Sequence, residues 1–337
     1  MAIIAKFTRT LPTPTATISG GFVFLLSAGW FTDSDTGTAG SPIDGGTNSI
    51  ANGGGDMQIF SDTATTTRLP IEVVTFVTGG SPQCQVWVRA PSYTAGDTIT
   101  IGKDDTQTTQ PAVGAAFGRN EVNQESALKS HFESISAVDS TGNNTMTVGS
   151  GVSLVTDGDF LENGANFDGT VNGKYTIADS SVFDSNHILI SGYIKPDSTS
   201  PANARLLGKQ GQYNFVLRSN SLYCELWTVG GVKTLLSSTT LVNGTKYHIA
   251  LEYDGIDIIY YIDGVISDSL TVSGGDLLNS ANSVFVAGRA ATSEAFPGSV
   301  YEFDVMVSSR GQDYISSHYL NQSDTDNFGT SSEYVLV

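Results

Sequence analysis

The segment YHIALEYDGIDIIYYIDGVISDSL, residues 247–270, contains two Asp-Gly pairs, each between apolar and aromatic residues. Asp-Gly is a dipeptide well suited to the positive φ angles of tight hairpin turns. The segment therefore predicts three consecutive antiparallel strands, joined at Asp254-Gly255 and at Asp263-Gly264. In this interpretation the two aspartates are turn residues and not a pair of catalytic carboxylates.

Alternation along the first of these strands predicts its buried face, because successive side chains of a strand point to opposite sides of the sheet. One face is mainly apolar and the other carries a histidine and a glutamate: Ile249, Leu251 and Tyr253 against His248, Ala250 and Glu252. We expect the first set to face the core.

The rest of the chain has the composition of an all-β protein, with short runs of β-branched and aromatic residues between Gly, Ser, Thr, Asn and Asp turns. At 337 residues it is long enough for two domains. One segment, NQESALKSHFE at residues 123–133, is typical of a helix and lies between two strand-rich halves. We predict two β-sandwich domains joined near residues 119–130.

The charge of the chain limits its partners. It has 16 basic and 34 acidic residues, a formal net charge of -18, which repels nucleic-acid phosphates. The acidity is typical of a solvated surface, with cation binding as the alternative. No apolar run approaches the ~20 residues that span a bilayer, and the first residues lack the apolar region of a secretory signal. We therefore expect no nucleic-acid partner, no membrane span and no export by that signal.

Two features of the first half bear on binding. TRTLPTPTATISGG, residues 8–21, contains two prolines and favours an extended path, either as an edge strand or as an arm that docks on a partner. The glycine-rich loop at residues 33–56 places Asp33 and Asp35 at a calcium-loop spacing, but no glutamate closes the loop. We interpret this pair as a solvated turn.

The two cysteines, Cys84 and Cys224, lie in separate strand-like runs far apart in the sequence. We expect two buried free thiols, with one long-range disulfide as the alternative. The four histidines are His131, His187, His248 and His318, and none lies beside a cysteine or in the G-x-S-x-G motif of a nucleophilic serine. Zinc-type spacings are also missing from the sequence.

The second half contains, in order, the segments GANFDGTVNGKYTIADSSVFDSNHILISGYIKP, LLGKQGQYNFVLRSNSLYCELW, LVNGTKYHIALEYDGIDIIYYIDGVI and FPGSVYEFDVMVSSR. This ordered series resembles the concanavalin A-like lectin/glucanase superfamily in its laminin-G-like form. Together they cover roughly residues 166–310. The resemblance implies a jelly roll of two curved sheets.

The first half contains the segments ANGGGDMQIFSDTATTTRLPIEVVTF and VWVRAPSYTAGDTITI. They resemble a small β domain of unknown function that often precedes lectin-like modules in surface proteins of bacteria and their phages. YISSHYLNQSDTDNF, residues 314–328, resembles the closing segment of such proteins. We therefore expect an N-terminal β-sandwich with an extended arm at residues 1–120, and a concanavalin A-like domain with its tail at residues 121–337.

Glycoside hydrolysis is the enzymatic function that this superfamily suggests, and it needs two carboxylates beside the scissile bond. YEFDVMVSSR supplies Glu302 and Asp304 at alternate positions, but the third acidic residue of the glucanase pattern is missing. We interpret these two residues as part of a polar sheet face and expect no catalytic residues and no enzymatic activity.

Carbohydrate binding is the remaining function of this class. In SLYCELWTV, Tyr223, Glu225 and Trp227 share one face, and aromatic side chains on a curved sheet are natural platforms for sugar rings. The alternative is that Trp227 packs under a loop or against the other domain. The resemblance also allows a rim calcium ion, although we expect no required cofactor and no metal ligand is assigned.

These observations predict a non-enzymatic virion protein of a phage: a head decoration, fibre or tail component with a lectin-like outer domain that binds glycans. We expect it on the virion surface, made in the host cytoplasm and released by lysis, with other virion proteins as partners and a homo-oligomer, a trimer, as its assembly. A glycan-active enzyme and a bacterial surface adhesin are the alternatives.

Overall fold

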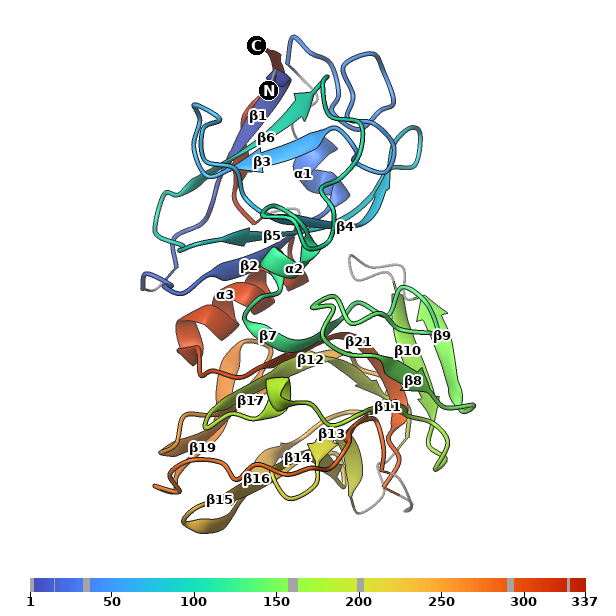
Figure 1. The fold of residues 1–337 in the computed structure, drawn as a ribbon, viewed down its shortest axis with the longest axis vertical. Helices are drawn as coiled ribbons and strands as arrows, with labels where there is room; N and C mark the ends of the chain where they lie inside the picture. Colours follow the sequence, from blue (N-terminus) through green and yellow to red (C-terminus); the bar gives the residue numbers. More distant parts are fainter. Residues whose placement is uncertain are drawn as a thin grey trace. The chain divides into compact units, whose positions relative to one another are not determined.

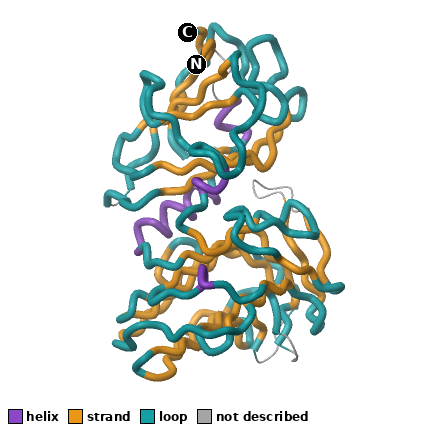
Figure 2. The backbone as a smooth tube through the Cα atoms, in the orientation of Figure 1, coloured by secondary structure: helices purple, strands orange, loops and turns teal. Residues whose placement is uncertain are grey.

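The computed structural model describes residues 3–14, 16–32, 37–156, 163–198, 203–289, 294–325 and 328–337. Strands dominate, with few helices among them (Figures 1 and 2). Internal contacts divide the chain into two units: the first unit, residues 1–124 with 317–337, and the second unit, residues 125–316. All the strand pairs are antiparallel, so the expected all-β class is confirmed.

Two sheets form the first unit. The larger has five strands in the order β22-β1-β6-β3, with β23 also on β1: β1 (Ile3–Thr10), β3 (Met57–Phe60), β6 (Thr98–Asp104), β22 (Thr330–Ser331) and β23 (Val335–Leu336). The smaller has three: β2 (Phe22–Leu26), β5 (Gln83–Ala90) and β4 (Ile71–Val77). Phe31, from helix α1 (Ala28–Thr32), contacts Phe7 and Phe76 at ring-centroid distances of 5.6 and 5.1 Å. Because Phe7 belongs to the larger sheet and Phe76 to the smaller, these rings join the two.

The N-terminal arm differs from the expectation. β1 pairs with β6 on one side and with β22 and β23 on the other, so it is an interior strand. Leu11 is buried, and Ile18 exchanges backbone hydrogen bonds with Tyr93. The prolines of this segment therefore follow an interior strand, and the described part of the arm packs within the first unit.

The C-terminal tail also differs from the expectation, because residues 317–337 belong to the first unit. Asn321, in helix α3 (Gly311–Ser323), accepts a hydrogen bond from the Leu25 N–H at 2.6 Å and donates one to the Leu25 carbonyl at 3.0 Å. The indole N–H of Trp30 donates to the Thr325 carbonyl at 2.6 Å. The expected domain of residues 121–337 therefore has the wrong C-terminal limit, since the tail completes the sheet that contains β1.

The expected helix at residues 123–133 is wrong as well. Helix α2 is only Arg119–Val122, and the next element is strand β7 (Ser126–Ser130). This strand pairs with β21 (Pro297–Met306), with Lys129 opposite Asp304. Long-range pairing overrides the helical propensity of this short segment.

Two larger sheets form the second unit. The β17 sheet has eight strands in the order β19-β18-β17-β12-β21-β10-β9, with β7 also on β21. Its other strands are β9 (Val152–Thr156), β10 (Asn163–Asp168), β12 (Ile188–Pro196), β17 (Tyr247–Tyr253), β18 (Asp257–Ile262) and β19 (Val265–Thr271).

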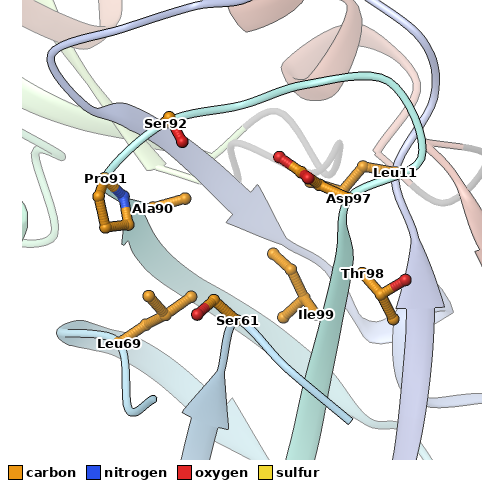
Figure 3. Close-up of a pocket in the computed structure, with 9 residues that line it drawn as sticks. All are labelled: Leu11, Ser61, Leu69, Ala90, Pro91, Ser92, Asp97, Thr98 and Ile99. Atoms are coloured by element: carbon orange, nitrogen blue, oxygen red, sulfur yellow. The ribbon is translucent and has the colours of Figure 1, made fainter.

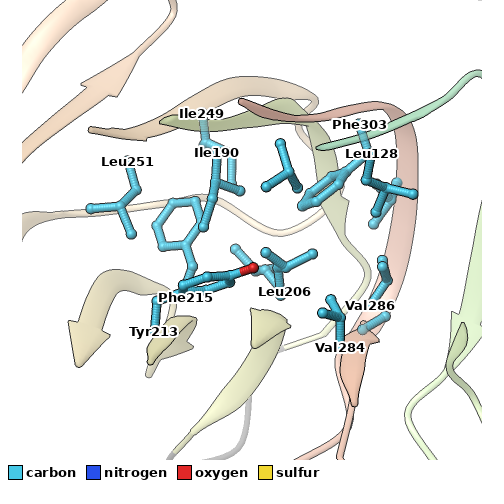
Figure 4. Close-up of a cluster of buried hydrophobic side chains, with 14 of the residues drawn as sticks. Leu128, Ile190, Leu206, Tyr213, Phe215, Ile249, Leu251, Val284, Val286 and Phe303 are labelled. Atoms are coloured by element: carbon cyan, nitrogen blue, oxygen red, sulfur yellow. The ribbon is translucent and has the colours of Figure 1, made fainter. Parts of the chain in front are cut away.

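The β15 sheet has seven strands in the order β16-β15-β14-β13-β20-β11-β8. They are β8 (Met146–Val148), β11 (Tyr175–Ile177), β13 (Ala204–Lys209), β14 (Tyr213–Arg218), β15 (Ser221–Thr228), β16 (Gly231–Thr240) and β20 (Val284–Val286). A short 3-10 helix, η1, covers Ser181–Phe183. Apolar side chains of the two sheets meet in one core, where Ile249 and Leu251 of β17 lie opposite Phe215 of β14 (Figure 4). This is the two-sheet sandwich that the resemblance implies.

The strands predicted from residues 247–270 are confirmed as β17, β18 and β19. Asp263 and Gly264 have φ angles of +50° and +73°, as a tight hairpin turn requires. Asp254 accepts hydrogen bonds from the backbone N–H groups of Ile256 and Asp257 at 2.9 and 2.7 Å. Both aspartates are therefore turn residues.

The buried face of β17 is also as expected, because Ile249, Leu251 and Tyr253 lie in the core. Cys84 and Cys224 are both buried and are not joined by a disulfide, which confirms the expected pair of buried thiols. Burial raises the pKa of the Cys224 thiol to about 11, so it stays protonated at neutral pH.

Among the helices of the described ranges, none combines the length and apolarity needed to cross a membrane.

Candidate glycan site

Strand β15 presents the three residues expected to bind sugar on the face away from the core. Alternation directs Leu222, Cys224 and Leu226 into the core and leaves Tyr223, Glu225 and Trp227 on the outer face. Trp227 and Glu225 are half-buried, whereas Tyr223 is only 8% exposed. The guanidinium of Arg218 covers the Tyr223 ring, 3.6 Å from its centroid. Tyr223 is therefore a wall of the site and not an open stacking platform.

A cavity of about 180 Å³ adjoins this face, and we call it the β15 pocket. Its lining is mostly polar: Asn203, Arg205, Gln210, Val216, Tyr223, Glu225, Arg289 and Glu294. The structure thus brings Tyr223 and Glu225 together in one pocket but leaves Trp227 outside its lining. Trp227 follows Glu225 by two positions on the same face of β15, about 7 Å further along the strand.

The polar groups of the β15 pocket form a connected set of hydrogen bonds. Glu225 accepts from the Tyr223 hydroxyl at 3.3 Å and from the side-chain amide of Asn214 at 3.1 Å. The Arg205 guanidinium donates to the Asn214 side-chain oxygen, and its other terminal nitrogen donates to Glu294 at 2.7 Å. The pocket therefore has fixed donors and acceptors before any ligand arrives.

Burial controls the charge states of this pocket. Arg205 is 2% exposed, and burial lowers the pKa of its guanidinium while the Glu294 carboxylate opposes that effect. A guanidinium stays charged in proteins, so Arg205 remains a donor. Burial and the neighbouring Glu225 carboxylate raise the pKa of the Tyr223 phenol, which therefore keeps its proton.

Sequence reasoning identified only the β15 side of this pocket. Arg205, Asn214 and Glu294 come from separate positions in the chain, and no local pattern in the sequence marks them as binding residues. In β14, whose sequence is YNFVLR, alternation places Asn214 on the face opposite the apolar Phe215. Alternation does not identify Arg205 or Glu294, which come from other parts of the chain.

The carboxylates of Glu302 and Asp304 are buried in the second unit, at 2% and 4% exposure. The Lys129 ammonium lies 2.5 Å from Glu302 and 3.3 Å from Asp304, and the His131 ring nitrogen lies 2.7 Å from Glu302. Burial alone would lower the pKa of Lys129, but these two carboxylates raise it above its ordinary value. The two carboxylates thus belong to a buried charge cluster with Lys129.

A second cavity, of about 170 Å³, lies in the first unit where β5 ends and β6 begins (Figure 3). Leu11, Leu69 and Ile99 give it an apolar lining. Its charged lining residue, Asp97, accepts hydrogen bonds from the Thr94 N–H and hydroxyl at 2.7 and 3.1 Å. Asp97 therefore stabilises the turn that begins at Thr94, and we assign no function to this cavity.

Within the described ranges, no three His, Cys, Asp or Glu side chains gather closely enough to hold a metal ion. The spacing of Asp33 and Asp35 predicted a solvated turn, and both residues lie outside the described residues. His318 contacts Gln322 at 2.9 Å between side-chain nitrogens and lies near Trp87, at a ring-centroid distance of 6.2 Å. These are packing contacts of the first unit.

Residues 168–316 match the sequence model of the concanavalin A-like lectin/glucanases superfamily, in its laminin-G-like form. This confirms the resemblance of the second half. A search of curated proteins gave no match to the chain.

Solved structures with a similar fold include two toxin domains. The binding domain of Paraclostridial Mosquitocidal Protein 1 matches with a TM-score of 0.53 and 13% identity, over 60% of this chain and 53% of that chain. The botulinum neurotoxin serotype G binding domain matches with a TM-score of 0.50 and 17% identity, over 59% of this chain and 52% of that chain. This chain thus covers about half the length of each, and the likeness shows the fold alone.

Domain 4 of an extracellular arabinanase from Geobacillus stearothermophilus, solved with arabinotriose, is also similar. Its TM-score is 0.46 at 16% identity, over 58% of this chain and 98% of that chain. This likeness is too weak to carry an inference.

Proposed function

We propose that this chain is a non-enzymatic binding protein whose second unit binds glycans at the β15 pocket. The observation that carries the proposal is the preformed set of donors and acceptors around Tyr223 and Glu225, on a concanavalin A-like unit. A few fixed polar groups in a concave site are what orients a small ligand. Trp227 extends the same face and offers a ring for a neighbouring sugar.

The placement of the acidic residues supports binding without cleavage. Glu302 and Asp304, the pair suggested by the glucanase pattern, are buried and paired with Lys129. A glycosidase needs one carboxylic acid and one carboxylate on either side of the substrate. The alternative of a glycan-active enzyme is therefore the weaker one.

The test is to apply the full chain to a panel of immobilised oligosaccharides and to assay the same sugars for new reducing ends. We expect retention on some members of the panel and no release of reducing sugar. Release of reducing ends would support the enzymatic alternative.

We further infer that the protein is a structural component of a phage virion, as a head decoration, fibre or tail protein. The support is the similarity of its first half to the small β domain that precedes lectin-like modules in surface proteins of bacteria and phages. In this proposal the host cytoplasm makes the protein, lysis releases it, and it meets other virion proteins and glycans at the particle surface. Mass spectrometry of purified particles tests the location, and recovery from a bacterial envelope without particles would favour the adhesin alternative.

The proposal of a virion protein also includes its oligomeric state and whether it requires a cofactor. We expect a homo-oligomer, with a trimer as the state typical of fibres, and light scattering of the full chain measures it. The lining of the β15 pocket supplies its own donors and acceptors, so we expect glycan binding to need no metal, although the excess of acidic residues allows calcium at the rim. Unchanged glycan binding after dialysis against EDTA is the expected result.

A further inference from the structure

The charges that line the β15 pocket cancel. Two arginines and two glutamates line it, Arg205, Arg289, Glu225 and Glu294, and its other lining residues are uncharged. The chain as a whole has a formal net charge of -18, so the lining is neutral on an acidic protein, with Arg218 as a further cation against the Tyr223 ring.

Glu294 forms ion pairs with both arginines of the lining. It lies 2.7 Å from a terminal nitrogen of Arg205 and 3.4 Å from one of Arg289. An incoming carboxylate or sulfate would have to displace Glu294 and would also meet the charge of Glu225. Because like charges in a partly desolvated site repel strongly, the pocket disfavours an anionic ligand.

The remaining hydrogen-bonding capacity suits hydroxyl groups. The two Glu225 oxygens each accept one hydrogen bond within the protein, and a carboxylate oxygen can accept more. The Nε of Arg205 is buried and has no hydrogen-bond partner among the described residues. A hydroxyl both donates and accepts, so neighbouring hydroxyls could donate to Glu225 and accept from a guanidinium or amide of the lining.

The size and walls of the pocket fit one sugar ring. A cavity of about 180 Å³ is smaller than the ~300 Å³ lower limit of drug-sized sites. Val216 and the ring of Tyr223 give the lining an apolar part, and Arg218 stacked on that ring holds it in place. A ring with an apolar face and polar edges matches this combination.

We propose that the β15 pocket selects an uncharged sugar ring with adjacent free hydroxyls and rejects sugars that carry a carboxylate or sulfate. The inference rests on the proposed glycan binding and adds the class of sugar. Glu225 and Arg205 are the residues that recognise the hydroxyls, and Glu294 is the residue that excludes anions by neutralising the arginines.

The experiment is calorimetric titration of the full chain with two matched probes. The first probe is a neutral galacto-oligosaccharide or gluco-oligosaccharide that retains the protein in the panel experiment. The second is the same oligosaccharide oxidised to the uronate at C6. We expect the neutral probe to bind at least about tenfold more tightly, a difference of about 1.4 kcal/mol. Its affinity should change less than about twofold between about 50 mM and about 500 mM NaCl, because no net charge is neutralised.

Glu225→Gln tests the site itself. The substitution keeps the size of the side chain but replaces the carboxylate, which accepts hydrogen bonds from the sugar hydroxyls, by a neutral amide. We therefore expect about a tenfold loss of affinity for the neutral probe. Glu333→Gln makes the same chemical change at an exposed position of the first unit and should leave the affinity unchanged. Tyr223→Phe, which removes one hydroxyl and keeps the ring, is the second variant if Glu225→Gln does not fold.

The outcomes separate the two proposals. Tighter and salt-sensitive binding of the uronate would overturn the selection of neutral sugars and leave glycan binding intact. Unchanged binding by folded Glu225→Gln and Tyr223→Phe would show that the sugar binds elsewhere and would overturn the assignment to this pocket. Binding of no sugar on the panel would overturn the proposed function itself, and this inference with it.

Discussion

Lys129 is the residue on which the buried charges of the second unit depend. It is 1% exposed and its ammonium lies within 3.3 Å of both Glu302 and Asp304. Removing one member of a buried ion pair leaves its partner charged and unsolvated, which is far more costly than losing a surface pair.

Lys129→Met should therefore lower the free energy of unfolding of the second unit by about 3–5 kcal/mol. Denaturant unfolding followed by tryptophan fluorescence measures the change. Lys233→Met is the matched control on β16, because Lys233 is half-buried at the edge of the other sheet. A loss for Lys129→Met no greater than that of the control would mean that the buried charges are not stabilised by Lys129.

His248 makes the second unit sensitive to acid. Burial, together with the nearby charge of Lys129, lowers the pKa of its imidazole to about 3. The group stays neutral in the folded protein down to that pH, but in the unfolded chain it takes up a proton near pH 6.5. Protonation therefore favours the unfolded state between about pH 6.5 and 3, and this contribution to stability is complete only above pH 6.5.

His248→Phe should remove that dependence. As the pH falls from about 6.5 to about 4, we expect the variant to lose less stability than the wild type, by up to about 1.4 kcal/mol for each pH unit. Urea unfolding at several pH values measures it. His187→Phe, at a half-buried histidine, is the control, and identical pH profiles for His248→Phe and the wild type would contradict the prediction.

Trp227 is the residue of the proposed glycan site that lies outside the lining of the β15 pocket. If it supports a second sugar ring, Trp227→Ala should weaken binding of an oligosaccharide by about fivefold, or about 1 kcal/mol, and leave binding of the monosaccharide unchanged. Titration with both ligands checks this. An equal loss for both would place Trp227 in the primary site.

At the scale of elements, the β17–β18–β19 meander depends on its turns. The second turn has two successive residues with positive φ, Asp263 at +50° and Gly264 at +73°. Asp263 also accepts a hydrogen bond from the His248 N–H at 2.9 Å, which joins the turn to the start of β17. Glycine adopts such a φ without strain because it has no Cβ, and aspartate is one of the few other residues that tolerate it.

Gly264→Ala should destabilise the second unit by about 1–2 kcal/mol, because alanine at this φ brings its Cβ close to the backbone. Gly80→Ala, at an exposed glycine without positive φ and with open space around it, should change stability by less than about 0.5 kcal/mol. Thermal melting of both variants gives the comparison. Equal melting temperatures would mean that the turn can relax without strain.

At the scale of the whole molecule, the first unit is built from both ends of the chain. Arg9 is fully buried, and its guanidinium donates to the Phe328 carbonyl at 3.0 Å and to the Ser331 hydroxyl at 2.9 Å. Without the tail, this charge would be buried without those acceptors and β1 would lose its pairing with β22 and β23.

A chain that ends at Ser316 should therefore lose the folded first unit and keep the second. Differential calorimetry should show the disappearance of one transition, while proteolysis leaves a stable fragment close to residues 125–316. Persistence of both transitions in the truncated chain would show that residues 1–124 fold without the tail.

The sequence alone determined the local features of this fold. Alternation identified the core faces of β15 and β17, the Asp-Gly pairs identified the turns at Asp254 and Asp263, and the strand-like surroundings of Cys84 and Cys224 indicated buried thiols. Each of these depends on residues within one strand or turn, where φ preference and side-chain period act directly.

Only the tertiary structure decided which distant segments meet. Part of the expected helix at residues 123–133 is strand β7, because it pairs with β21. This pairing also brings Lys129 close to Glu302 and Asp304. The tail returned to β1, and strands β13, β14 and β15 with Glu294 assembled the β15 pocket. Such contacts depend on strand register and on the total burial gained across the fold, which no local pattern of residues encodes.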